Sequence, residues 1–243
     1  MAQEDLRENE KIISLEVDGI LLKGTFHDPG VSYPPVVIGC HGLFADRQSP
    51  KQTALARAVC KEGIAFLRLD HRGCGDSQGD FKRVTTLANR LRDLLGAMDF
   101  VKSQMGLRGK MGLFGSSMGG AVCLKAAMKK PVDCLIANAA PIDFTSVIDV
   151  LRKSGQHNLL SQAFYEENPV LVKDQDLPIS RILVFHGHQD ETVPVSHALA
   201  LHAMCQEPKK LRLFKNGDHR MSSSQDQGIF IRESVKWYKE FLL

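Results

Sequence analysis

The sequence predicts an α/β fold with a mostly parallel central sheet of about eight strands, helices on both faces, an N-terminal antiparallel hairpin and a short lid. Three observations predict it. Short apolar runs alternate with helical segments along most of the chain. The first two runs flank Asp18-Gly19, a pair typical of a two-residue hairpin turn. One long segment, 141–178, interrupts the alternation by far more than an ordinary connection.

The strands are predicted from apolar runs bounded by turn residues. Residues 11–17 and 20–26 flank the Asp18-Gly19 turn and form the expected hairpin. The run VVIGC, which follows Pro34-Pro35, suits a strand that is buried on both faces. The remaining expected strands are 64–70, 110–115, 132–140, 181–187 and 210–216.

The helices are predicted from apolar spacing and helix-forming residues. Residues 84–105 carry an apolar stripe at helical spacing. Further helices are expected at 51–62, 121–128, 195–205 and 222–241, with short ones at 145–152 and 158–166. A repeated strand-then-helix order implies parallel strands. We find no internal repeat and no linker, so we expect one domain over 1–243 with a lid insertion at about 141–178; an ordinary decorated crossover is the alternative to a lid.

Composition excludes several classes of function. The chain has 243 residues, is 43% hydrophobic and 24% charged, and carries a net charge of +3, which is typical of a soluble globular protein. Without a long basic block or an apolar run of about 18 residues, neither nucleic acid nor a membrane is an expected partner. The polar N-terminus and six scattered cysteines favour a cytoplasmic protein with free thiols, although their even number leaves a disulfide open. No exposed apolar stripe indicates an oligomeric state.

The stretch GLFGSSMGGA, residues 112–121, holds the strongest chemical signal. Gly115, Ser117 and Gly119 fit G-x-S-x-G between an expected strand and an expected helix, the context of a nucleophile elbow. The turn is so sharp that residues two before and two after the nucleophile must lack bulk. Ser117 meets that condition, whereas Ser116 would have Phe114 and Met118 at those positions. We therefore expect Ser117 to be the nucleophile; a plain Gly/Ser turn is the alternative.

A serine nucleophile needs a base, and the base needs an acid that orients it. Asp190, in HGHQDETVP, follows one expected strand, and His219, in NGDHR, follows the next. Both fall at the carboxyl edge of the sheet beside Ser117, in the chain order serine, acid, histidine. We expect His219 to accept the serine proton and Asp190 to stabilise the resulting imidazolium.

Other acids and histidines near these positions are weaker alternatives. Asp143 follows an earlier strand and could replace Asp190, whereas Asp218 is expected to be solvated. His186 and His188 precede Asp190 and are expected to belong to the loop structure or the pocket lining. A metal site would have to be built from His186, His188, His197 and His202, which lack a recognised ligand spacing.

The oxyanion of an acyl-transfer reaction needs backbone N–H donors. One donor is expected at Met118, directly after the nucleophile. The second is expected in CHGLFADR, where Gly42 lets the backbone turn inward and Leu43 follows; Phe44 is the next position. We expect His41 to brace this loop by hydrogen bonds, because it precedes the nucleophile and is a poor base.

Together, HGLFADR, LDHRGCGDSQG, GSSMGG, HGHQDETVP and NGDH resemble the α/β-hydrolase superfamily over nearly the whole chain. Within it the sequence resembles small cinnamoyl/feruloyl-esterase-like and dienelactone-hydrolase-like esterases, and serine-aminopeptidase-like hydrolases. Dienelactone hydrolases carry cysteine where this chain has Ser117, which disfavours their chemistry. The resemblance implies a cytoplasmic serine carboxylesterase that acts on a small-molecule ester through an acyl-enzyme on Ser117, with no metal or organic cofactor.

Two other activities fit the same residues. A peptidase or amidase would need a carboxylate to bind the substrate amine, which Glu166 or Glu167 could supply. A thioesterase would use the same three groups, and a non-catalytic binding protein is the remaining class. For substrate selection we expect apolar side chains of the 141–178 segment, Phe164 and Tyr165 among them, to form a wall over Ser117 together with Phe44.

Overall fold

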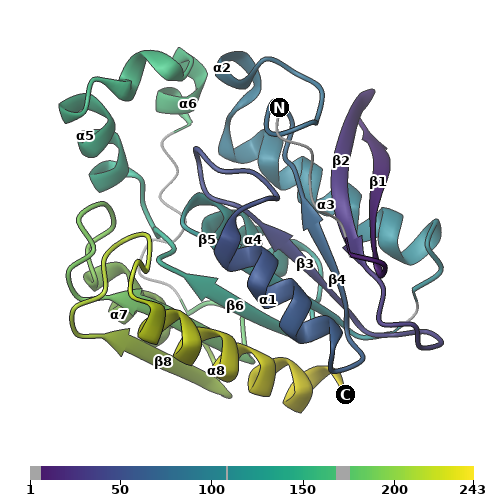
Figure 1. Cartoon of the computed structure of the whole chain (residues 1–243). Coiled ribbons are helices and arrows are strands. Elements are labelled where there is room, and N and C mark those ends of the chain that lie inside the picture. The colour runs from purple at the N-terminus through teal and green to yellow at the C-terminus, as the bar shows by residue number, and fades with distance from the viewer. Residues whose placement is uncertain (1–6, 108, 168–175) are drawn as a thin grey trace.

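One sheet of eight strands forms the centre of the molecule (Figure 1). The computed structural model describes residues 7–107, 109–167 and 176–243. The strands are β1 (Glu10–Val17), β2 (Ile20–His27), β3 (Val36–Cys40), β4 (Ala65–Leu69), β5 (Met111–Ser116), β6 (Cys134–Asn138), β7 (Ile182–Gly187) and β8 (Lys209–Phe214). They lie in the order β1-β2-β4-β3-β5-β6-β7-β8. The pairs β1–β2 and β2–β4 are antiparallel and all others are parallel, as the sequence predicts.

The N-terminal hairpin turns at Asp18 and Gly19. Their φ angles are 53° and 75°, the left-handed pair that a two-residue turn of type I′ requires. The central strands β3, β4 and β6 are buried along their whole length, which is why their sequences are mostly apolar rather than alternating. The polar exceptions are Arg68 in β4 and Asn138 in β6, and both are buried. Parallel strands end at one edge of the sheet, so the loops after β3, β5, β7 and β8 meet there.

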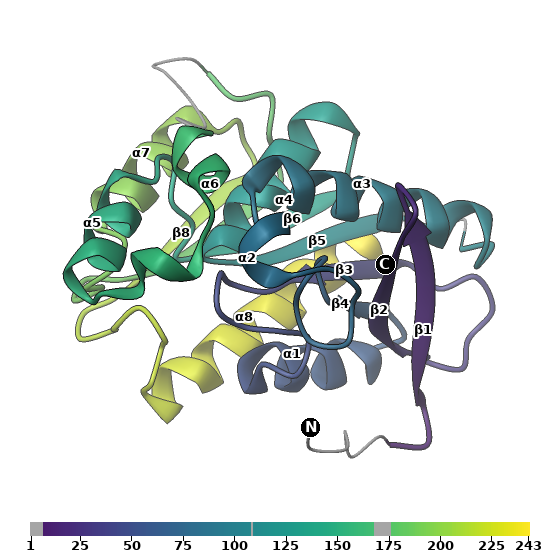
Figure 2. The same cartoon turned by 90° about the horizontal axis from the view of Figure 1, so that it is seen from above.

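Helices cover both faces of the sheet (Figure 2). On one face, α1 (Pro50–Cys60) and α8 (Ser224–Leu242) bury an aromatic cluster that includes Phe230, Trp237 and Tyr238. On the other, α3 (Leu87–Ser103), α4 (Met118–Lys129) and α7 (Ser196–Met204) bury the larger cluster. The expected apolar stripe of the 84–105 helix lies in that cluster, so the two helical layers hold the sheet edge rigidly from both sides.

A one-turn helix, α2 (Phe81–Val84), precedes α3 and is absent from the sequence prediction. The Asp80 carboxylate caps it by accepting a hydrogen bond from the Arg83 N–H at 3.0 Å. The following helix begins at Leu87 rather than at 84, because Thr86 caps it through the Asn89 N–H at 3.1 Å. The Thr86 cap therefore starts the helix three residues later than the apolar spacing alone predicts.

The 141–178 segment forms three short helices over its described part: α5 (Thr145–Lys153), η1 (Gln156–Leu159) and α6 (Gln162–Glu166). Residues 168–175 of the expected lid lie outside the described residues. Contrary to the expectation from the sequence, no lid is evident among the described residues. The physical reason is packing: Ile148, Leu151, Leu160 and Phe164 are buried in the large cluster, so the segment is part of the body of the fold.

The six cysteines are all free and buried. Cys40, Cys123 and Cys134, the three that the sequence places among apolar neighbours, are fully buried. Among the helices that the structure describes, none is long and apolar enough to cross a bilayer.

Candidate active site

The chain turns sharply at Ser117, between β5 and α4. Its backbone has φ 52° and ψ −124°, a left-handed conformation that is strained for a serine. A Cβ atom on Gly115 would lie 2.4 Å from the Gly119 oxygen, and one on Gly119 would lie 2.3 Å from the Cys40 oxygen. The corner therefore excludes side chains at the two positions that flank Ser117 by two residues. This is the steric condition from which the sequence predicts Ser117, rather than Ser116, at the apex.

Three predicted side chains from three separate loops meet in one hydrogen-bond chain. The Ser117 Oγ lies 3.0 Å from His219 Nε2, and His219 Nδ1 lies 2.8 Å from Asp190 Oδ2. A carboxylate can only accept, so Nδ1 carries the proton and Nε2 is free to accept from the serine hydroxyl. His219 is partly exposed, whereas the Asp190 side chain is buried. The arrangement can draw a proton from Ser117 onto an imidazole that a buried carboxylate stabilises.

Four donors surround the Asp190 carboxylate. The Thr192 and Val193 N–H groups donate to Oδ1 at 2.9 and 2.7 Å, and His186 Nε2 lies 3.2 Å from Oδ2. Burial by itself raises the pKa of this carboxyl, but the hydrogen bonds from His186 and His219 outweigh burial and hold the pKa well below its ordinary value. Asp190 is therefore ionised throughout the neutral range, the state in which it can stabilise an imidazolium.

His186 and Glu191 are site residues whose roles the sequence reasoning missed. His186 is fully buried at the end of β7, where its single Nε2–H is shared between the Val193 carbonyl at 2.8 Å and Asp190 Oδ2 at 3.2 Å. The Glu191 carboxylate accepts from the main-chain N–H of His219 at 3.1 Å. The one signal for His186 is its spacing of four residues from Asp190 across a turn; the contact of Glu191 with the next loop leaves no signal.

The alternative acids contact other groups. Asp143 accepts from the Thr145 N–H at 2.9 Å and lies 3.9 Å from His197 Nε2. Asp218, although it adjoins His219 in sequence, accepts from the Ser222 N–H and Oγ at 2.7 and 2.6 Å. These hydrogen bonds from Ser222 lower the pKa of Asp218.

The histidines that the sequence analysis considers as possible metal ligands do not form a metal site. His197 Nδ1 accepts from the Ile142 N–H at 3.1 Å, and His188 is exposed. Within the described ranges no three histidine, cysteine or carboxylate side chains come together as metal ligands would. The adjacent serine, Ser116, accepts a hydrogen bond from Asn138 Nδ2 at 3.2 Å and stands at the end of β5.

The loop after β3, residues 41–49, lies beside Ser117. A Cβ atom on Gly42 would lie 3.6 Å from the Ser117 Cβ. His41 braces the loop as expected, since its Nδ1 donates to the Gly42 carbonyl at 2.8 Å and its Nε2 accepts from the His71 N–H at 3.3 Å. Burial holds the pKa of His41 well below its ordinary value, so its neutral form suits both bonds. The Leu43 N–H follows Gly42 in this loop, and the Met118 N–H opens α4, where helical N–H groups lack helical acceptors.

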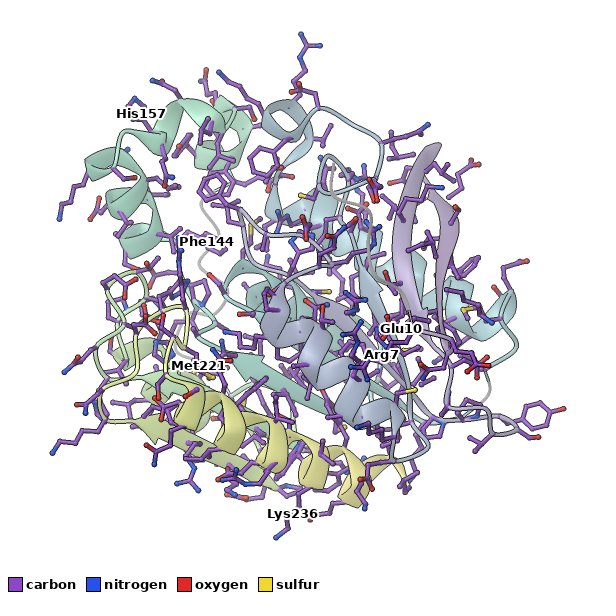
Figure 3. All side chains as sticks on the ribbon, in the orientation of Figure 1. Arg7, Glu10, Phe144, His157, Met221 and Lys236 are labelled. Atoms are coloured by element: carbon purple, nitrogen blue, oxygen red, sulfur yellow. The ribbon has the colours of Figure 1, made fainter. Side chains whose placement is uncertain are left out.

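The three predicted pocket residues lie in two places. Phe44 is exposed and packs against Phe81 of α2, with 5.8 Å between ring centroids. Phe164 is buried against Phe144 and Tyr165, and the Tyr165 hydroxyl donates to the His157 carbonyl at 2.8 Å. In Figure 3, His157 lies at the outer edge of this segment and Phe144 lies nearer the sheet. A wall over Ser117 built from Phe44, Phe164 and Tyr165 stays a prediction.

Comparison with known proteins places the chain among hydrolases. It is 27% identical over 225 residues to the uncharacterized protein YfhR of Escherichia coli K12, covering 90% of this chain and 76% of that protein. It is 26% identical over 222 residues to mouse mitochondrial palmitoyl-protein thioesterase ABHD10, covering 81% and 73%. The structure of Est1E from Butyrivibrio proteoclasticus, solved with ferulic acid, superposes with a TM-score of 0.76 at 20% identity, covering 94% and 98%.

A family model described as serine aminopeptidase, S33 matches residues 34–161, just over half of the chain. That stretch holds the loop after β3, the corner at Ser117 and helix α5. The chain therefore belongs to the serine aminopeptidase S33 family of α/β hydrolases.

Proposed function

We propose that the protein is a serine hydrolase that cleaves small carboxylic esters through an acyl-enzyme on Ser117. The observation that carries the proposal is the hydrogen-bond chain from Ser117 Oγ through His219 to Asp190, with its distances of 3.0 and 2.8 Å. Its serine stands on a strained corner that exposes the hydroxyl at the sheet edge. In this proposal the three side chains form a catalytic triad.

The proposed reaction has two halves. In the first, Ser117 Oγ attacks the ester carbonyl carbon while its proton passes to His219 Nε2. The bond from that carbon to the alcohol oxygen then breaks, and Nε2 returns the proton to the leaving alcohol. In the second, water attacks the acyl-enzyme, His219 takes its proton, and the bond to Ser117 Oγ breaks as the serine recovers the proton. No metal or organic cofactor enters these steps.

Negative charge develops on the carbonyl oxygen in both halves. We assign its stabilisation to the N–H groups of Leu43 and Met118, which belong to the loop beside Ser117 and to the first turn of α4. The amino end of a helix also favours negative charge. Backbone donors that are fixed before the substrate binds cost no reorganisation when the charge appears, which is why they lower the barrier.

Two neighbouring activities remain alternatives on the same triad. The family description names a serine aminopeptidase, and a curated relative is a palmitoyl-protein thioesterase. An aminopeptidase needs a free carboxylate for the substrate amine. Glu167 instead accepts from the Ala88 N–H at 3.2 Å, and Glu166 accepts from the Gln162 amide. Because these hydrogen bonds occupy both carboxylates, they favour ester hydrolysis over peptide hydrolysis.

The proposal is tested with purified protein on three substrate series: nitrophenyl esters of increasing acyl length, thioesters of the same acyl groups, and aminoacyl anilides. We expect the highest kcat/KM on esters, with all of that activity absent from Ser117→Ala. Faster cleavage of thioesters or anilides would replace the ester assignment with the corresponding alternative. Ester cleavage that survives in Ser117→Ala would contradict the triad itself.

A further inference from the structure

An arginine on α3 reaches the loop that carries the proposed oxyanion donor. Arg90 Nη1 donates to the His41 and Gly42 carbonyls at 3.3 and 3.1 Å, and Nη2 donates to the Leu43 carbonyl at 2.9 Å. One guanidinium therefore binds three successive carbonyls of the loop after β3. The middle residue of the three, Gly42, lies beside Ser117.

Arg90 is a buried charge, and burying a charge costs free energy. Its side chain is fully buried, and its fourth contact is the Cys74 sulfur at 3.4 Å. Among the described residues no carboxylate forms an ion pair with it. A buried charge destabilises the fold unless hydrogen bonds satisfy it, and an apolar side chain would fill the same space without that penalty. The carbonyl contacts are thus the feature that an arginine, and no apolar residue, supplies here.

When the carbonyl of a peptide group is fixed in place, the direction of the N–H of the same group is fixed too. In a planar trans peptide the C=O and the N–H of the same unit point in opposite directions. The Gly42 carbonyl faces Arg90, and His41 Nδ1 donates to the same oxygen at 2.8 Å, so the Leu43 N–H is directed away from both. Ser117 lies beside Gly42, with its Cβ 3.6 Å from a Cβ built on that glycine.

Glycine at position 42 makes this restraint necessary. Without a Cβ, Gly42 can rotate the following peptide with little steric resistance, which would turn the Leu43 N–H out of the site. Arg90 stands in the first turn of α3, whose start is fixed by the Thr86 cap and by Glu167 at the Ala88 N–H. The restraint therefore comes from a rigid element rather than from the loop itself.

We infer that Arg90 is a positioning residue that keeps the Leu43 N–H aimed at the oxyanion. The inference rests on the proposed function, because it presumes that an oxyanion forms beside Ser117. Arg90 does not touch the substrate; it acts by preventing rotation of the Gly42–Leu43 peptide. Its loss should therefore weaken binding of the transition state and leave binding of the ester ground state nearly unchanged.

The test compares Arg90→Met and Arg90→Lys with the wild type on a nitrophenyl ester, with kcat expressed per active site after titration with a fluorophosphonate. Methionine keeps part of the stem and removes every donor, whereas lysine keeps one charge but cannot span three carbonyls. Arg92→Met is the matched control, because Arg92 is exposed on the same helix and contacts Asn89. Affinity for a trifluoromethyl ketone, whose adduct carries an oxyanion, is measured in parallel.

We expect kcat of Arg90→Met to fall about tenfold to a hundredfold, less than the loss from deleting an oxyanion donor outright. The trifluoromethyl ketone should bind more weakly by a similar factor, KM should change by less than about threefold, and Arg92→Met should match the wild type. A purely structural role would instead reduce the titrated active fraction and leave kcat per site unchanged, which would overturn the inference.

Arg90→Lys decides the matter if Arg90→Met does not fold. A folded lysine variant with kcat and ketone affinity within twofold of the wild type would overturn the inference. The failure of the proposed function has a different signature: wild-type protein that neither cleaves esters nor reacts with the fluorophosphonate. That result would remove the role of Arg90 together with the reaction.

Discussion

The corner at Ser117 and the 141–167 segment lie at the same edge of the sheet but are held by different forces. The corner is held by backbone sterics and directed hydrogen bonds: glycines without room for a Cβ, and a histidine between a serine and a buried carboxylate. The segment is held by apolar side chains that join the large core cluster. Directed contacts fix atoms in space, whereas apolar packing fixes only which faces are buried.

This difference teaches where reaction and selectivity are encoded. A substitution at the corner removes a contact that has no substitute, so its effect on turnover should be large and its effect on stability small. A substitution in the segment changes packing, so stability should respond first. Variants at the corner and in the segment should therefore separate the loss of turnover from the loss of stability.

Among the variants of the corner, Ser117→Ala should cause the largest loss of activity. Removing the nucleophile should lower kcat by on the order of 10⁴-fold or more, because the histidine and the carboxylate then act on nothing. Ser116→Ala is the matched control, since its hydroxyl contacts Asn138 and not His219. Steady-state kinetics on a nitrophenyl ester with circular dichroism checks both variants. If Ser116→Ala were inactive and Ser117→Ala active, the nucleophile would be Ser116 instead.

Asp190→Asn should come next, with a loss of kcat on the order of 10⁴-fold if the amide presents the wrong partner to His219 Nδ1. Asp143→Asn should lose far less, because Asp143 faces Thr145 and His197. The same ester assay ranks the two variants. The reverse ranking would identify Asp143 as the acid.

His186→Leu should lower kcat by a smaller factor than Asp190→Asn. The variant loses one donor to Asp190, while His219 and two main-chain N–H groups remain. A hydrogen bond to a charged group is worth about 1.5–3 kcal/mol, so we expect roughly a tenfold loss of kcat or more. His188→Leu, an exposed neighbour, should leave kcat unchanged. Equal kinetics for the two variants would show that His186 only fills space.

Phe164→Ala and Phe44→Ala should separate packing from selectivity. Phe164 is buried between Phe144 and Tyr165, so its truncation should cost about 3–5 kcal/mol of unfolding free energy. Phe44 is exposed, so its truncation should change stability by about 0.5 kcal/mol or less and shift acyl-length preference up to about tenfold. Denaturant unfolding and the ester series measure both. A stable Phe164→Ala with altered preference would place the substrate against this segment.

The sequence predicts the elements and the corner well because both depend on local chemistry. Continuous apolar runs predict buried parallel strands, and the bulk of Phe114 and Met118 excludes Ser116 from the apex without any structure. The prediction of a lid fails because the composition of 141–167 shows that the segment has apolar side chains but not which surface they pack against. The role of Arg90 depends on contacts between a helix and a separate loop, and no local pattern indicates it. For His186 the spacing of four residues to Asp190 is the one signal, and it does not show that the two side chains meet.

The most direct test of the central claim is the site of covalent labelling by a fluorophosphonate. The probe should transfer one phosphonyl group to the serine that His219 activates, with loss of fluoride. Intact mass and peptide mapping of the purified wild-type protein should show one equivalent on Ser117, and Ser117→Ala should take up none. A label on Ser116 or on a serine outside the 112–121 stretch, or no label at all, would contradict the account.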